Sequence, residues 1–166
     1  MSHAMGHADM SGSGTERGGM GRPYLMLAAM TVVHVAIMYV LMFAMIDRAA
    51  HFVNNINMFY MALLMAAPIT AVMVLSMWGM YPNGGVKAAV VAASLLVGLL
   101  SWLAIRQQWA VGDEEFLRSM IPHHSGAILM CREASFTDPR LVELCRGIVE
   151  SQREEIQQME AFLAER

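Results

Sequence analysis

Side chains that bind soft metal ions gather in the last third of the chain. A Met-x-x-His-His motif begins at Met120, and a glutamate and a methionine follow one helical turn apart further along the sequence. Thioether sulfur and imidazole nitrogen suit a soft or borderline ion, Cu(I) above all. A carboxylate in such a set can bind the ion or orient an imidazole. The candidate metal ligands are Met120, His123, His124, Met130, Glu155 and Met159.

Two amphipathic helices are expected to position these ligands. Asp113 and Asp138 are predicted helix caps, with Pro139 at the first position of the second helix. The connection, Ser135 to Thr137, is short, so the helices should be antiparallel neighbours. A helical projection places His123 on the inward face of the first helix and His124 at its edge. The inward face of the second helix is predicted to hold Leu141, Cys145, Ile148, Gln152, Glu155, Ile156, Met159 and Leu163.

The pairing of the two helices brings Cys131 opposite Cys145 and His124 opposite Gln152. Met120, Glu155 and Met159 then join the histidines in one cluster. The cysteines have three open interpretations: buried or free thiols, a disulfide in an oxidising compartment, or thiolate ligands that extend the metal site. We count both cysteines as secondary metal candidates.

Methionine is concentrated in two uncharged runs that precede this region. Tyr24–Ile46 and Met58–Met80 each contain 23 residues without a charge, long enough to cross a bilayer as helices. A third run, Ala88–Ile105, has no methionine, so methionine is not the generic apolar residue of this chain. The methionines of the first two runs and one histidine could form a ladder for Cu(I), or they could fill helix interfaces. The secondary candidates here are Met30, His34 and Met38.

The first 23 residues form a third place where soft ligands gather. Gly, Ser and Thr dominate Ser11–Gly21, which predicts a disordered tail. Short His and Met tracts in such a segment can chelate copper, although an arbitrary terminus is an equal alternative. The candidates in the tail are His3, Met5, His7 and Met10.

Composition supports a membrane protein. The chain has 166 residues, of which 57% are hydrophobic and only 15% charged, and its net charge of −3 gives no basic field for nucleic acid. The predicted fold class is all-α: three transmembrane helices followed by an antiparallel helical hairpin. The predicted domains are a tail (1–23), a membrane domain (24–110, with helices at about 24–46, 58–80 and 88–105) and the hairpin (112–166).

The orientation in the membrane follows from the distribution of basic residues. Three basic residues lie on the side of the tail, and Arg48 and Arg106 lie near the membrane on the other side. This count places the tail in the cytoplasm and the hairpin outside. In a bacterium the expected location is therefore the inner membrane, with a periplasmic hairpin.

The motif residues of the hairpin resemble a known family. Asp113-x-x-Phe116-x-x-x-Met120-Ile121-Pro122-His123-His124 and the later Gln152-x-x-Glu155-Ile156-x-x-Met159 are similar to the bacterial family catalogued as domain of unknown function 305. The resemblance covers about residues 112–164 and implies a ferritin-like helical bundle. It also implies copper binding by Met and His, at Met120, His123, His124, Met130 and Met159. A single hairpin is half of a four-helix bundle, so we expect a homodimer.

These observations favour a membrane protein that binds, stores or hands over copper in metal homeostasis or resistance. Its expected partners are the lipid bilayer, the metal ion and a second copy of the chain. One alternative is a ferritin-like, metal-dependent oxidoreductase, but the inward face offers Glu155 alone and the chain contains no Glu-x-x-His pair. The other is an adaptor without metal that dimerises through the hairpin. No catalytic residues are predicted.

Overall fold

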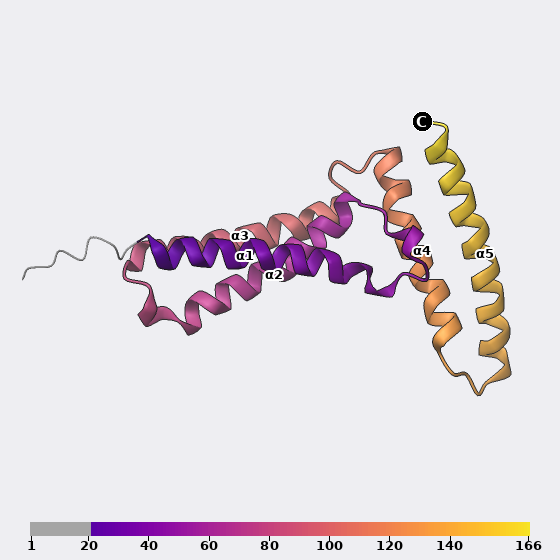
Figure 1. Ribbon diagram of the computed structural model, residues 1–166, viewed down its shortest axis with the longest axis horizontal. Coiled ribbons are helices and arrows are strands. Elements are labelled where there is room, and N and C mark those ends of the chain that lie inside the picture. The colour runs from indigo at the N-terminus through magenta and orange to yellow at the C-terminus, as the bar shows by residue number, and fades with distance from the viewer. Residues whose placement is uncertain (1–20) are drawn as a thin grey trace, which may run out of the picture.

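The computed structural model describes residues 21–166, and within this range all of the regular secondary structure is helical, with no strand (Figure 1). The candidate ligands of the tail, His3, Met5, His7 and Met10, lie outside the described residues. The five long helices are α1 (Arg22–Leu41), α2 (Ile56–Ser76), α3 (Gly84–Gln107), α4 (Asp113–Glu133) and α5 (Pro139–Ala164). Short 3₁₀ helices are η1 (Met42–Met45), η2 (Ala49–His51) and η3 (Trp78–Met80).

The three predicted membrane spans are confirmed as helices that are long and apolar enough to cross a bilayer. Their ends differ from the expected ones because asparagine side chains start two of them. Asn55 accepts a hydrogen bond from the backbone N–H of Met58, so α2 begins two residues earlier than expected and ends at Ser76. Asn83 caps α3 in the same way through Gly85 and Val86.

Small residues allow the membrane helices to pack closely around α2, which contacts both α1 and α3. The buried side of α2 consists mainly of alanine, including Ala62, Ala66 and Ala71. A Cβ added at Gly98 of α3 would lie 3.4 Å from the Cβ of Ala67, so the two backbones approach closely there. The three spans therefore form one bundle with α2 between its neighbours.

Helices α4 and α5 form the predicted hairpin and run across the direction of α1 and α3, at the end where α1 and α3 finish (Figure 1). The two helices pack against each other and are joined by residues 134–138. Their shared core contains Leu117, Ile121, Ile128, Ile156 and Met159, with Val53 from the α1–α2 connection packed against it. The hairpin is thus bound both within itself and to the connection that follows α1.

One of the two predicted caps of the hairpin is wrong and the other is confirmed. Gly112, not Asp113, occupies the cap position of α4, and no side chain caps this end. Asp113 lies in the first turn, where the helix dipole favours an acid, and forms an ion pair with Arg166. Asp138 caps α5 as expected and accepts a hydrogen bond of 2.9 Å from the backbone N–H of Arg140.

The Asp138 cap should make the start of α5 sensitive to acid. The side chain of Arg140, and then its backbone N–H, hold the pKa of Asp138 below its usual range. A lowered pKa in the folded state means that the stabilisation is present above the ordinary pKa and is lost as the pH falls through the folded one. Asp138→Asn keeps the cap without this titration. We expect amide exchange in the first turn of α5 to accelerate at acidic pH in the wild type relative to Asp138→Asn; an unchanged ratio across the pH range would contradict this role.

Candidate functional site

A histidine and a glutamate link the two helices of the hairpin at the centre of the predicted metal cluster. The Nε2 atom of His124 lies 2.7 Å from Oε2 of Glu155, and its Nδ1 atom lies 2.8 Å from the backbone oxygen of Met120. The side chain of His124 is 10% exposed and that of Glu155 46% exposed. The pair therefore has one buried partner and one that reaches the surface.

The two contacts of His124 fix the orientation of its ring. A backbone carbonyl can only accept a hydrogen bond, so Nδ1 must donate to Met120. The Nε2 atom is then directed at the carboxylate of Glu155. An imidazole whose other nitrogen donates to a backbone carbonyl is the usual arrangement of a histidine that binds a metal.

The carboxylate of Glu155 is also held in place by its own helix. Ser151 donates a hydrogen bond of 2.9 Å to Oε1, and Gln152 donates one of 3.3 Å to Oε2. Gln152, which was expected opposite His124, thus reaches the cluster through Glu155. The imidazole nitrogen of His124 and the carboxylate of Glu155 are therefore both held in position, with the amide of Gln152 beside them.

Two methionines lie one helical turn from this pair along their helices. Met120 precedes His124 by four residues and Met159 follows Glu155 by four, so each shares a helix face with its partner. Met159 is buried in the hairpin core, and Met120 packs against that core. We call Met120, His124, Glu155 and Met159 the His–Met cluster. Of these four, the structure shows direct side-chain contact only between His124 and Glu155, while Met120 and Met159 pack in the adjoining core.

The other two predicted ligands, His123 and Met130, lie apart from this cluster. His123 is exposed, with its ring centre 6.0 Å from that of His124, and Met130 is also exposed. The expected helix face had His123 inside and His124 at the edge, and the structure reverses them. The reason is that α4 packs on two sides, against α5 and against the α1–α2 connection, which rotates its buried surface toward His124, Ser125 and Ile128.

Cys131 and Cys145 form a disulfide with a Cα–Cα distance of 5.2 Å. This bond confirms the predicted register of the hairpin, in which the two cysteines face each other. It corrects the interpretations as free thiols or thiolate ligands for this form of the protein, because a disulfide sulfur carries no thiolate. Both cysteines are half-buried.

The membrane candidates do not share one interior surface among the described residues. Met30 is exposed on α1, whereas His34 and Met38 are partly buried. His34 borders a small apolar cleft beside Pro68 and Met73 of α2. Several further methionines of the two spans are exposed, namely Met26, Met45, Met61, Met65, Met77 and Met80. A thioether ladder therefore stays a prediction.

Within residues 21–166, no three His, Cys, Asp or Glu side chains converge closely enough to hold a metal ion. His124 and Glu155 supply only two donors of these types. A metal site in one hairpin therefore depends on methionine sulfur. Met120 lies one turn from His124 on α4, and Met159 lies one turn from Glu155 on α5.

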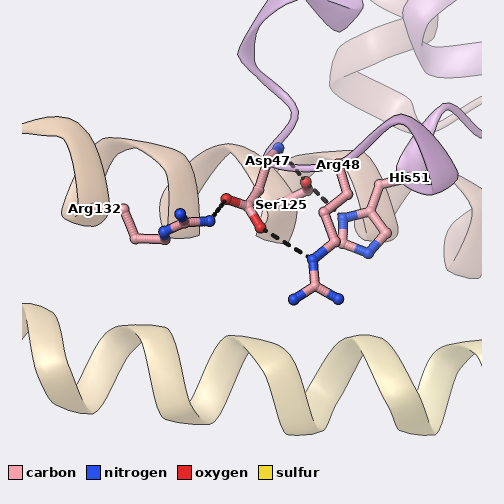
Figure 2. A network of polar contacts seen from close by, with 5 residues as sticks. All are labelled: Asp47, Arg48, His51, Ser125 and Arg132. Atoms are coloured by element: carbon pink, nitrogen blue, oxygen red, sulfur yellow. Dashed lines mark hydrogen bonds and ion pairs between the residues drawn. The ribbon is translucent and has the colours of Figure 1, made fainter.

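A polar junction, missed by the sequence analysis, joins the hairpin to the connection that follows α1 (Figure 2). The Oγ atom of Ser125 accepts a hydrogen bond of 2.7 Å from the backbone N–H of Asp47 and lies 2.7 Å from Nδ1 of His51. The Asp47 side chain is only 2% exposed and pairs with Arg132 of α4 and with Arg48. Hydrogen bonds and ion pairs thus hold the connection after α1 against α4.

The junction is structural, although it contains a serine, a histidine and an aspartate. The carboxylate of Asp47 contacts the two arginines rather than His51, and Ser125 is fully buried, so they do not form a nucleophilic triad. A Cβ added at Gly126 would lie 3.4 Å from the backbone oxygen of Met45, which shows how closely the connection approaches α4. The adjacent small residues Ser125 and Gly126 allow this approach, but small residues are common in amphipathic helices, so their pattern alone does not identify the contact.

Removal of the Ser125 hydroxyl should weaken the junction. Ser125→Ala leaves the part-buried backbone N–H of Asp47 and the buried Nδ1 atom of His51 without their partner. An unsatisfied buried donor costs about 1–3 kcal/mol. We expect a loss of this size in the free energy of unfolding of the full chain in detergent. Ser135→Ala, in the exposed α4–α5 connection, should change it by less than about 0.5 kcal/mol; equal effects would show that the junction carries no stability.

The comparisons with known proteins agree with the position of this hairpin. Residues 103–163 match the family described as "Domain of unknown function (DUF305)". An uncharacterized protein of Acanthamoeba polyphaga mimivirus is 33% identical over 114 residues, which cover 68% of this chain and 73% of the viral protein. This chain belongs to the DUF305 family. The DUF305 match spans the end of α3, all of α4 and most of α5. No solved structure matches the chain.

Proposed function

We propose that this DUF305 protein is an integral membrane protein that binds copper as Cu(I) and stores it or hands it over in metal homeostasis or resistance. The His–Met cluster of the hairpin is the proposed site. His124 supplies nitrogen, Met120 and Met159 supply sulfur, and Glu155 either binds the ion or receives the proton that it displaces.

The orientation of His124 carries this proposal. Because Nδ1 donates to the backbone oxygen of Met120, only Nε2 can serve an ion, and it faces the Glu155 carboxylate at 2.7 Å. A proton shared between these two atoms is what a cation replaces when it binds. The buried His124 ring is already oriented before an ion binds, so little conformational entropy of this side chain is lost on binding.

The sulfur donors support Cu(I) over harder ions. One imidazole and one carboxylate alone suit several divalent metals, but thioether ligands select soft ions. Met159 is buried, and Met120 is partly buried against the same core. The two methionine-rich spans add further thioethers on the same chain.

The disulfide and the membrane spans support the proposed location. Disulfides persist in oxidising compartments, which favours a hairpin outside the cytoplasm. The distribution of basic residues, with three on the side of the tail and two on the other, also favours a hairpin outside the cytoplasm. In a bacterial cell the protein would lie in the inner membrane with a periplasmic hairpin. A single hairpin is half of a four-helix bundle, so the proposal includes a homodimer.

Copper titration of the full chain in detergent tests the proposal. The oxidised protein competes for Cu(I) with a chromophoric chelator, and sedimentation follows its mass. We expect at least one tightly held ion per chain. Absence of binding at micromolar free copper would overturn the proposed function.

A further inference from the structure

We propose that the Cys131–Cys145 disulfide is a second, redox-gated metal site: once reduced, the two cysteines bind one Cu(I) ion as a pair of thiolates. This site lies two turns along α4 from His124 and uses none of its ligands. The inference therefore does not rest on the His–Met cluster.

The disulfide is accessible to a reductant. Both cysteines are half-buried and line an open groove of about 770 Å³ at the end of the hairpin. The groove also exposes the apolar side chains of Phe136, Val142 and Val149. A small thiol or a loop of a redox protein can thus reach the sulfur atoms without unfolding the hairpin.

The hydrophobic core of the hairpin is built without the disulfide. Its core, built from Ile121, Ile128 and Ile156 among others, excludes both cysteines. The connection between the helices, residues 134–138, already holds the chain together at this end. With Cα atoms 5.2 Å apart, small side-chain rotations let both sulfurs bind one ion after reduction.

The charges around the groove accommodate a thiolate complex. Arg146 and Arg153 line it, together with Glu150 and Glu154. Arg146 is ion-paired with Glu143, whereas Arg153 has no ion pair within the described part of the chain. A copper ion with two thiolates carries one net negative charge, which an unpaired guanidinium can offset.

Two external thiols reduce the Cys131–Cys145 disulfide in two exchange steps. A thiolate attacks one cysteine sulfur, forms a mixed disulfide and releases the other cysteine as a thiolate. A second thiol resolves the mixed disulfide, so two thiols are oxidised to one external disulfide and the protein gains two thiol groups. Cu(I) then binds both sulfurs and displaces two protons, with no change in its own oxidation state. Thiolates are preferred ligands of Cu(I).

Cu(I) binding to the full chain in detergent, in a His124→Leu/Glu155→Leu background, tests this inference separately from the proposed function. One sample stays oxidised and the other is reduced with a phosphine that is then removed. We expect reduction to add one tightly bound ion per chain and an ultraviolet band from thiolate-to-copper charge transfer. The Cys131→Ser/Cys145→Ser variant should show neither.

Three outcomes would overturn the inference. The reduced and oxidised proteins could bind equal copper, or the added ion could persist in the double serine variant. The third is loss of helical circular dichroism on reduction, because the sulfurs would then no longer be held together. A failure of the His–Met cluster to bind copper would leave all three results unaffected.

Discussion

Replacement of His124 by leucine is expected to lower the affinity of the oxidised protein for Cu(I) by more than about a hundredfold, because it removes a ligand rather than a supporting group, whose loss costs about 10–100-fold. Leucine fills a similar volume to the imidazole ring but has no atom that can bind the ion. His123→Leu, one residue away on an exposed surface, is the matched control and should change the affinity far less. Competition with a chromophoric chelator measures both.

The same substitution should have a small effect on folding. Glu155 is almost half exposed, so it returns to water when His124 is absent, and its pairing is screened by solvent. Loss of copper with unchanged stability would mark His124 as a ligand. If His123→Leu instead abolished binding while His124→Leu did not, the site would lie on the outer face of α4 and our assignment would be wrong.

Ile121→Ala is expected to be the most destabilising single change in the hairpin. Ile121 is 1% exposed in the core shared by α4, α5 and the α1–α2 connection. Truncation of such a side chain costs about 2–5 kcal/mol, and Ile121→Val about 0.5–1.5 kcal/mol. Denaturant unfolding of the full chain in detergent measures the losses.

Leu144→Ala provides the control for this series. Leu144 lies on the outer side of α5 and is 58% exposed. A change of less than about 0.5 kcal/mol is expected there. An equally mild effect at Ile121 would mean that the hairpin and the connection do not share a core in solution.

The spans and the hairpin could be predicted from the sequence because their signals are local. Three uncharged runs are sufficient to identify membrane-length helices, and Asp138-Pro139 marks the start of α5. The register of the hairpin follows from one short connection, and Cys131 meets Cys145 as that register requires. Met120, Glu155 and Met159 lie on the inward faces, as this register predicts.

The inward histidine and the polar junction depend on contacts that local patterns do not reveal. A projection of one helix assumes a single buried face, but α4 is covered on two sides, and this selects His124 over His123. The junction forms because the fold brings Asp47 and His51 into contact with Ser125 of α4, which lies 78 and 74 positions later in the sequence. Their partner, Ser125, looks like an ordinary small residue of an amphipathic helix.

X-ray absorption at the copper edge of the loaded, oxidised full chain tests the central claim most directly. We predict a mixed coordination shell, in which nitrogen or oxygen and sulfur both scatter around copper. His124→Leu should remove the imidazole scattering. A shell of sulfur alone that is unaffected by His124→Leu would place the copper on the membrane methionines, and a shell without sulfur would contradict the role of Met120 and Met159.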